Sequence, residues 1–468
     1  MDVFATAREM ARALRAREVS ARELVVAHLD RIDAVDGRVN AVVTRVPERA
    51  LAEADAADAR LAAGEPVGPL HGLPIAHKDT HLTAGIRTTF GSPLLADHVP
   101  DADELVVERM RGAGAITIGK TNVPEFAAGS HTFNPVFGKT SNPYALDRSA
   151  GGSSGGAAAA LASGMHPLAD GSDMGGSLRN PASFCNVVGL RPSPGRVPTH
   201  PAALPWQTMS VQGPMARTVA DTALLLSVLA GPDPRSPISL DDPGSVFAAP
   251  LDRDLTGLRV AWAPTLGGAV TVDPAVTAAL APAAAVFAHL GAHVEPACPD
   301  LTGADDVFRT LRAWLFAATM GPQRDRVKAT LAANIDDGRR LTGDDLARAE
   351  LARAALFHRV RAFFTRYDVL LAPVSQVPPF DAALEHPTEI DGVPHPHYLD
   401  WMASAYLVSA AGLPALSVPA AFTPDGLPVG LQVVGPPRGD LAVLQVGHAF
   451  EQATQVGLRR PELRPVRQ

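Results

Sequence analysis

Two glycine-rich turns that contain serine, at residues 151–156 and 174–177, carry the strongest chemical signal in the sequence. The first reads GGSSGG and the second MGGS, and a run of small residues follows the first. Successive backbone N–H groups in such a turn can point into one concavity, which is the geometry that stabilises an oxyanion. A serine hydroxyl is a poor nucleophile near neutral pH unless a base takes its proton. The two turns therefore indicate nucleophilic serine chemistry, and the base must come from elsewhere in the chain.

Lys78 is the candidate base. It closely follows a short apolar run, Leu73–Ala76, that begins in a Gly-Leu-Pro turn, which places the lysine at the end of a candidate strand. Most lysines are solvated and charged, and residue type alone favours that interpretation of Lys78. A buried lysine, in contrast, has its pKa lowered enough to act as a neutral base. Both interpretations remain open on these residues alone.

Other interpretations of the glycine-rich segments are weaker. A Gly/Ser run is usually a flexible linker, but GGSSGG leads into AAAALAS at 157–163, which is typical of a compact helix. Residues 152–156 also fit the G-x-S-x-G turn of α/β-hydrolases with Ser154 as nucleophile, although no strand leads into it. Gly114–Thr121 fits a phosphate-binding loop, but its interior is β-branched and Pro124 follows where a helix should run. We therefore disfavour a linker, a hydrolase elbow and a nucleotide site.

A short histidine pattern offers potential metal ligands. His395 and His397 flank a proline, with His386 and Asp391 nearby in sequence. The proline-rich surroundings favour a solvated loop instead. Nothing else in the sequence calls for a metal, so we expect neither a metal nor an organic cofactor.

Composition excludes several classes of function. The chain of 468 residues has a formal net charge of −8 without a basic block, which argues against nucleic acid as a ligand. No apolar run is long enough to cross a bilayer, and we expect no membrane association. Two cysteines far apart in sequence, Cys185 and Cys298, favour a reducing cytoplasm over a disulfide framework. We therefore expect a small-molecule substrate as the ligand. The sequence does not decide between a monomer and a homodimer.

Helix-like and strand-like segments alternate along the chain, which predicts an α/β fold with a buried sheet covered by helices. The candidate strands are AITIG at 115–119, LRVAWA at 258–263, DVLLAP at 368–373 and VGLQVVG at 429–435. The longest helical patterns cover Thr218–Leu229, Val276–Leu290, Asp345–Phe364 and Leu441–Thr454. The Pro/Gly-rich segment 231–244 is a candidate linker, but similar strands continue after it. We therefore expect one α/β domain with a surface insertion there.

Taken together, the motifs resemble the amidase signature family. GGSSGG at 151–156 and GSDMGGSLRNPASFC at 171–185 match its core pattern, and GLPIAHKD at 72–79 matches the segment that carries its lysine. Two flanking segments, 119–127 and 412–435, match as well, so the resemblance covers nearly the whole chain. It implies a single large domain with a twisted mixed β-sheet covered by helices on both faces. Within this domain, the resemblance implies an N-terminal helical part at 1–66, a signature core at 67–200 and a surface loop at 231–250. It also implies a variable helical part at the substrate entrance, 300–366.

Carried over by position, the resemblance implies a Ser–Ser–Lys triad. Ser177 is then the nucleophile, Ser153 relays its proton from a position after a cis peptide bond to Gly152, and neutral Lys78 is the base. Ser154, beside the relay, is expected to support the loop by hydrogen bonding. The implied oxyanion donors are the backbone N–H groups of Met174, Gly175, Gly176 and Ser177. The carboxylates expected to hold the surrounding backbone and Arg179 are those of Asp79 and Asp173.

The activity that the resemblance implies is that of a stand-alone serine amidohydrolase, which cleaves the C–N bond of amides. Aryl carbamates, which would make the enzyme a urethanase, and esters are further candidate substrates. Met174 stands where the family more often has Thr or Ile, which favours an apolar or aromatic acyl group. The candidate pocket residues are Phe133, Trp206, Trp314 and Met402.

The main alternative is the glutaminase subunit of a tRNA-dependent amidotransferase. The glutamine site of that relative has an acidic residue in the helix ahead of the G-L-P motif, where this chain has WMASAYLV with Met402 near that place and Asp400 close by. Met402 disfavours the amidotransferase. A binding protein of the same fold without turnover is disfavoured because Lys78, Ser153 and Ser177 are all present.

Overall fold

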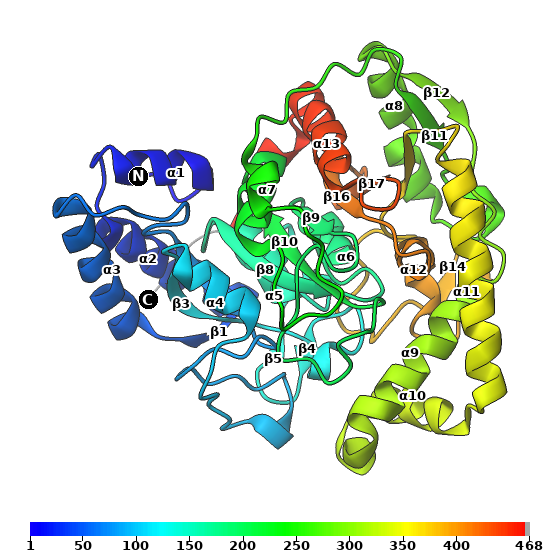
Figure 1. The fold of residues 1–468 in the computed structure, drawn as a ribbon, viewed down its shortest axis with the longest axis horizontal. Coiled ribbons are helices and arrows are strands. Elements are labelled where there is room, and N and C mark those ends of the chain that lie inside the picture. The colour runs from blue at the N-terminus through cyan, green and yellow to red at the C-terminus, as the bar shows by residue number, and fades with distance from the viewer. Residues whose placement is uncertain (464–468) are drawn as a thin grey trace.

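A mixed sheet of eight strands runs through the middle of the molecule in the computed structural model, which describes residues 1–463 (Figure 1). In spatial order the strands are β12 (His293–Pro296), β11 (Arg259–Trp262), β13 (Val369–Pro373), β17 (Pro428–Val434), β16 (Ala415–Phe422), β9 (Val188–Arg191), β10 (Val211–Ala216) and β8 (Leu168–Asp173). β11 pairs in parallel with β12 and β13, and the other neighbouring pairs are antiparallel. The mixed sheet that the family resemblance implies is therefore confirmed.

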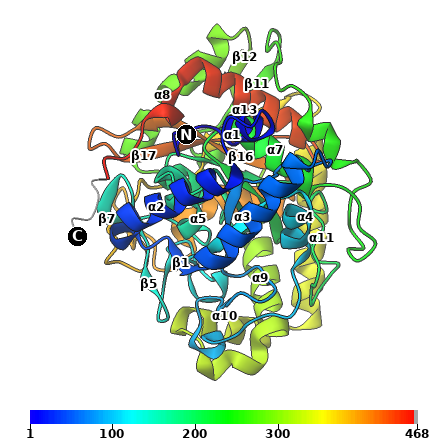
Figure 2. The same cartoon turned by 90° about the vertical axis from the view of Figure 1, so that its left-hand side faces the viewer.

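A second sheet, of three strands, carries Lys78. In spatial order its strands are β1 (Val42–Arg45), β3 (Ile116–Thr121) and β2 (Pro74–Lys78). Four helices of the N-terminal part lie on the side of the molecule that faces the viewer in Figure 2, and α2 and α3 among them pack against this sheet. They are α1 (Ala7–Arg15), α2 (Ala21–Val39), α3 (Pro47–Ala62) and α4 (Leu105–Gly112). The backbone N–H of Lys78 donates to Asp170 of β8 at 2.7 Å, so the end of β2 lies against the edge of the large sheet.

Helices cover both faces of the large sheet, as predicted. Leu416 and Ser417 are consecutive residues of β16, so their side chains point to opposite faces. A Cβ added to Gly447 would lie 2.2 Å from Leu416, whereas Ser417 and Ser183 both lie against Gly430. Gly447 belongs to a helix on one face and Ser183 to a helix on the other. The helices around this sheet are α6 (Arg179–Phe184), α7 (Val219–Leu229), α8 (Pro274–His289), α12 (Ala403–Ala410) and α13 (Asp440–Thr454).

The longest predicted elements are present, with ends that differ by a few residues. The four predicted strands correspond to β3, β11, β13 and β17, and the four predicted helices to α7, α8, α13 and α11 (Gly343–Phe363). The phosphate-loop pattern at Gly114–Thr121 mostly forms strand β3, as its β-branched residues predict. The hydrophobic period therefore identified these elements correctly.

Small residues allow helix α5 (Gly155–Ala162) to be buried along its whole length. A Cβ on Gly155 would lie 2.2 Å from the Thr132 side chain, and one on Gly156 would lie 2.3 Å from the backbone nitrogen of Asn122. Glycine at these two positions thus lets the helix begin in direct contact with the segments around Thr132 and Asn122. The compact helix predicted after GGSSGG is confirmed, and it holds residues 151–154 next to β2 and β8.

The remaining elements lie mostly at the edges of the fold. Helices α9 (Ala304–Met320), α10 (Ala329–Arg340) and α11 occupy the segment expected at the substrate entrance, and this role stays a prediction. In the expected surface loop 231–250 the regular structure is a short 3-10 turn, Gly244–Ala248. The short strands are β4 (Phe133–Asn134), β5 (Gly138–Lys139), β6 (Ser141–Asn142), β7 (Ala145–Ser149), β14 (Glu389–Ile390) and β15 (Val393–Pro394). Among residues 1–463, no helix combines the length and the apolarity needed to span a membrane.

Candidate active site

Lys78 is fully buried and faces two serine hydroxyls. Its Nζ lies 2.8 Å from Ser153 Oγ and 2.9 Å from Ser172 Oγ. The side chain is 0% exposed, at the end of β2. Of the two interpretations that the sequence left open for Lys78, the buried one is confirmed.

Burial makes Lys78 a weak base that can be neutral near pH 7. Removal from water lowers its pKa from 10.5 to about 7, because a charged ammonium is poorly solvated inside the protein. The carboxylates of Asp170, Asp173 and Glu104 act in the opposite direction and keep the pKa from falling further. The balance leaves an amine that exchanges protons at physiological pH, as a general base requires.

The loop that presents Ser153 is fixed by neighbouring hydroxyls. The peptide bond between Gly152 and Ser153 is cis, as the family resemblance implies. Ser130 donates to the carbonyl of Gly152 at 2.6 Å, and Thr132 donates to the carbonyl of Gly151 at 2.8 Å. Ser153 is therefore held in one position, with its hydroxyl directed at Lys78.

The turn that carries Ser177 is held by the carboxylate of Asp173, the last residue of β8. This carboxylate accepts the N–H groups of Gly176 at 2.9 Å and Leu178 at 3.2 Å. The N–H of Ser154 donates to the carbonyl of Ser177 at 3.2 Å, which joins the two serine turns directly. Gly176 has φ +110°, and a Cβ there would lie 2.6 Å from Ala405. Glycine is therefore required at this position.

One of the four predicted oxyanion donors is already in use. The N–H of Gly176 is bound to Asp173, so its predicted role as an oxyanion donor is wrong for this geometry. The N–H groups of Met174, Gly175 and Ser177 make no hydrogen bond to the described part of the chain, and they remain as candidate donors. Sequence alone shows which residues form a turn but not which of its N–H groups points outward.

Asp173 is a buried charge with strong partners. Arg179 binds it with two nitrogens at 3.0 Å, and Arg191 approaches the same carboxylate at 3.2 Å. Burial alone would raise the pKa of Asp173, but the two guanidinium groups and the N–H donors lower it below its ordinary value. Arg179 in turn donates to Ser409 at 2.8 Å and to Gln432 at 2.5 Å. The expectation that Asp173 is structural and holds Arg179 agrees with these contacts.

Two other expected supporting roles have different outcomes. Asp79 accepts the N–H and the hydroxyl of Thr89, so it holds backbone as expected. The hydroxyl of Ser154 is buried and has no partner among residues 1–463, so the prediction that it supports the loop by hydrogen bonding is wrong. Ser154 Oγ packs against Gly171, where an added Cβ would lie only 2.7 Å from it. It is the backbone N–H of Ser154 that ties the loop.

Ser153 and Ser177 open into a common cavity of about 130 Å³. Its wall includes Met174 and Met402, the latter being one of the predicted pocket residues. The wall also includes groups that the sequence interpretation did not anticipate, namely Phe126, Ala127, Gly129, Ser172, Ser210, Arg312 and Phe316. The cavity therefore joins the two serines to an apolar wall that also contains one arginine.

Three predicted aromatic residues do not line this cavity. Trp206 is 73% exposed, so its placement in an acyl pocket is wrong. Trp314 lies two residues after Arg312 on α9, a spacing that turns its side chain away from the cavity. Phe133 instead packs on the His131 ring, with centroids 5.1 Å apart. Aromatic type alone did not indicate which rings face the substrate.

The unanticipated residues carry only weak sequence signals. Ser172 lies two residues after Asp170 on β8, so strand alternation places both on the face toward Lys78. Arg312 lies four residues after buried Phe308, on the inner face of α9. A charged residue at such a position is a usable signal, but it does not reveal what the charge faces.

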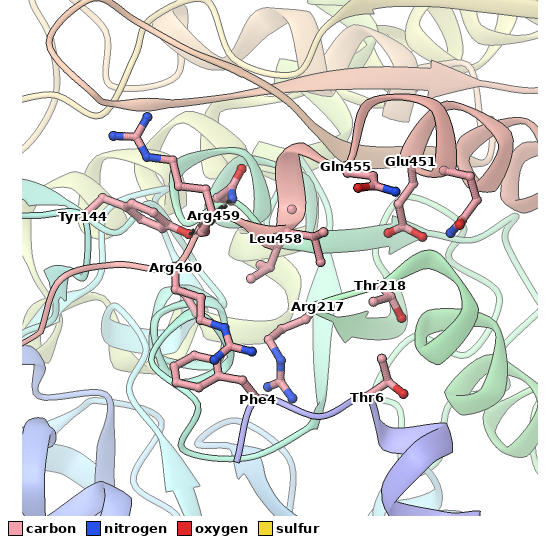
Figure 3. Close-up of a pocket in the computed structure, with 15 residues that line it drawn as sticks. Phe4, Thr6, Tyr144, Arg217, Thr218, Glu451, Gln455, Leu458, Arg459 and Arg460 are labelled. Atoms are coloured by element: carbon pink, nitrogen blue, oxygen red, sulfur yellow. Dashed lines mark hydrogen bonds between the residues drawn. The ribbon is translucent and has the colours of Figure 1, made fainter. Parts of the chain in front are cut away.

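A second cavity, of about 180 Å³, lies where the start of the chain meets α13 and the segment after it (Figure 3). None of the predicted catalytic residues lines it. Arg217 donates there to the carbonyls of Ala5 at 2.7 Å and His166 at 3.0 Å, and Arg460 pairs with Asp2 at 3.2 Å. Because the chain's own groups already satisfy these cations, this cavity carries no candidate chemistry.

Metal-ligating side chains do not gather anywhere in the part of the chain that the structure describes. No group of three histidine, cysteine, aspartate or glutamate residues there could hold a metal ion. Among the histidines noted in the sequence, His397 Nδ1 instead accepts the N–H of Leu399 at 3.2 Å.

Comparison with known proteins places the chain in one family. The profile described as Amidase matches residues 23–444. An acylamidase from Rhodococcus erythropolis is 38% identical over 464 residues, which are 97% of this chain and 97% of the relative. One subunit of the glutamyl-tRNA(Gln) amidotransferase from Moorella thermoacetica is 39% identical over 494 residues, covering 98% of this chain and 99% of the relative. Among solved structures, a bacterial aryl acylamidase of the amidase signature family matches with a TM-score of 0.91 and 32% identity, covering 98% of this chain and 99% of that one.

The chain therefore belongs to the amidase signature family. It is accordingly a serine amidohydrolase, an enzyme that cleaves amide bonds with a serine nucleophile.

Proposed function

We propose that Lys78, Ser153 and Ser177 form the catalytic triad of an amidase that acts on its own. The observation that carries this proposal is the fully buried Lys78 amine, 2.8 Å from Ser153 Oγ and with a pKa of about 7. The Ser153 and Ser177 hydroxyls both line the cavity, without a direct hydrogen bond between them in the described chain. Such catalytic contacts are often loose in the free enzyme and tighten once substrate is bound.

In the proposed first step, Ser177 Oγ attacks the amide carbonyl carbon. Its proton passes to Ser153 Oγ while the proton of Ser153 passes to neutral Lys78. The N–H groups of Met174, Gly175 and Ser177 stabilise the oxyanion that forms. The proton then returns from Lys78 through Ser153 to the substrate nitrogen, the C–N bond breaks, and the acyl group remains as an ester on Ser177.

In the second step, water attacks this ester. The same chain of Ser153 and Lys78 accepts the proton of the water and delivers it to Ser177 Oγ as the C–O bond breaks. The carboxylic acid leaves, and the triad returns to its starting protonation state. The reaction balances without any group beyond substrate and water.

Amides with an apolar or aryl part are the proposed substrates, with aryl carbamates as a further class. Met174, Met402, Phe126 and Phe316 supply apolar surface to the cavity, which supports this choice. A carbamate presents the same carbonyl carbon to Ser177, so the triad needs no change to attack it.

The glutaminase subunit of an amidotransferase is the second candidate, because a relative of that kind is 39% identical. Its glutamine site requires an acidic residue, and the acidic residue near Met402 is Asp400. The carboxylate of Asp400 is bound by Arg309 at 2.7 Å and by the N–H of His397 at 2.8 Å, which leaves it poorly placed for a substrate amine. This contact favours the amidase that acts on its own.

A direct assay separates the two candidates. We expect aniline release from a simple anilide and from the matched aryl carbamate, and no ammonia from glutamine, with Ser177→Ala as the blank. Ammonia from glutamine in the absence of aniline release would instead support the amidotransferase interpretation. The ratio of the two aniline rates then ranks amide against carbamate.

The rate is expected to rise with pH through the pKa of Lys78, about 7, because the base must be neutral to accept a proton. Asp170 faces Lys78 and raises this pKa, so Asp170→Asn is expected to move the rise to lower pH. A kcat/KM profile of both proteins between about pH 5 and 9 tests this. A profile that is flat, or an Asp170→Asn profile that moves to higher pH, would contradict the assignment of Lys78.

A reducing cytoplasm is the proposed location of the protein. Cys185 and Cys298 are both free thiols, which supports this proposal. A homodimer remains a prediction, which light scattering during size-exclusion chromatography tests.

A further inference from the structure

One cation in the cavity wall has no role in the mechanism proposed above. Arg312 is 4% exposed and lines the same cavity as Ser153 and Ser177. Helix α9 also buries Phe308 and Leu315, so Arg312 lies on the inward face of this helix. A guanidinium remains charged in proteins, even though burial lowers the pKa of Arg312. The protein therefore maintains a positive charge in the wall of its candidate active site.

The ion pairs formed by helix α9 do not involve Arg312. Arg309, three positions earlier on the helix, binds Asp305 at 2.9 Å and Asp400 at 2.7 Å. In contrast, no carboxylate of residues 1–463 lies within ion-pair distance of Arg312. Buried charges are normally paired, because leaving water is costly for an ion. The missing partner of Arg312 is thus a feature to be explained.

Neutral groups hold the Arg312 side chain in place. Its guanidinium carbon lies 4.4 Å from the ring centroid of Phe316 and 5.4 Å from that of Tyr398. Its Nη1 donates to Asn334 Oδ1. These contacts orient the guanidinium without neutralising it, which is the arrangement expected of a cation kept for a ligand.

Two carboxylates that lie, like Arg312, around Lys328 are occupied elsewhere. Glu125 accepts the hydroxyl of Ser92 at 2.7 Å and the backbone N–H of Lys328 at 2.8 Å. Glu385 accepts the hydroxyl of Thr330 at 3.1 Å and lies 3.9 Å from Lys328 Nζ. Neither carboxylate is available to Arg312, so the charge at this point of the wall stays positive.

We propose that Arg312 binds a carboxylate at the far end of the acyl chain, so that monoamides of short dicarboxylic acids are preferred substrates. A planar guanidinium matches a carboxylate with two parallel hydrogen bonds. We place the carboxylate on the acyl side of the scissile bond. The acyl group stays bound on Ser177 while the amine departs to solvent, and the deeply buried Arg312 is suited to the group that stays in the cavity. A cavity of about 130 Å³ suits a short chain. The inference rests on the function proposed above and adds a charged end to its apolar substrates.

The preference can be measured on the unmodified enzyme. Glutaryl 4-nitroanilide and pentanoyl 4-nitroanilide have acyl chains of equal length and the same leaving group, and they differ by a carboxylate in place of a methyl group. We expect kcat/KM to be higher for the glutaryl substrate by about 10-fold or more, mainly through a lower KM. Equal values, or a preference for the pentanoyl substrate, would overturn the role of Arg312 while leaving the amidase proposal intact. Hydrolysis of neither substrate would count against the amidase proposal itself.

Substitution then assigns the preference to one side chain. Arg312→Gln is expected to lower kcat/KM for the glutaryl substrate about 10-fold more than for the pentanoyl substrate, which removes the preference, and Arg312→Lys is expected to restore part of it. Arg324→Gln is the matched control, because it removes the same charge from a guanidinium already paired with Asp336 on the surface. If Arg312→Gln lowered both rates equally, or if Arg324→Gln removed the preference as well, a merely structural or long-range role would follow.

Discussion

Replacing Ser177 by alanine is expected to lower kcat for a neutral anilide on the order of 10⁵-fold, because the substitution removes the atom that forms the acyl-enzyme. Ser177 is only 8% exposed, yet alanine introduces no new bulk and does not disturb the N–H donors of its turn. The melting temperature should therefore stay close to that of the parent. Release of 4-nitroaniline, followed by absorbance with enough enzyme to see a slow rate, provides the measurement.

Ser154 supplies the matched control for this prediction. It lies in the neighbouring turn, is fully buried, and has a hydroxyl without a partner in the described chain. Ser154→Ala is expected to keep the rate within a few-fold of the parent. If Ser154→Ala abolished turnover and Ser177→Ala did not, the hydrolase elbow centred on Ser154 would replace the triad.

Lys78→Ala is expected to lower kcat/KM by roughly 10³-fold near neutral pH, which is the usual contribution of a general base. The loss should be smaller at high pH, where hydroxide assists removal of the serine proton. The substitution also removes the amine that lies between Ser153 Oγ and Ser172 Oγ and leaves a small buried gap. We expect methylamine to enter this gap and to restore part of the activity.

Rescue distinguishes a base from a structural cation. A rescued rate should rise with the concentration of neutral methylamine rather than of methylammonium, because only the neutral amine accepts a proton. A rate for Lys78→Ala within a few-fold of the parent would show that the triad is assigned wrongly. A large loss without any rescue, accompanied by a lower melting temperature, would indicate that Lys78 chiefly supports the fold.

Local sequence patterns were sufficient for the elements that carry the site. The apolar run before Lys78 indicated a strand, and the small residues that follow GGSSGG indicated the compact helix α5. In both cases the determining physics lies within a few residues, as hydrophobic period or as steric freedom at glycine. The position of Lys78 at a strand end could therefore be predicted, whereas its burial could not be separated from solvation by residue type.

Features that depend on distant parts of the chain could not be predicted in this way. Trp206 and Trp314 are both aromatic, yet one is largely exposed and the other faces away from the cavity. Arg179 donates to Gln432, which lies far along the sequence. That Arg312 lacks a carboxylate partner becomes visible only when the surrounding carboxylates have been placed. Periodicity indicates which face of a helix is buried, but it does not indicate what that face meets.

The covalent intermediate is assigned to Ser177, and peptide mapping by mass spectrometry after treatment with a fluorophosphonate identifies the serine that reacts. We expect one adduct on the parent enzyme, located on Ser177, and none on Ser177→Ala. Labelling of Lys78→Ala should be much slower, since the serine then lacks its base. An adduct on Ser153 or Ser154, or a folded parent enzyme that takes up no label, would show that Ser177 is not the nucleophile.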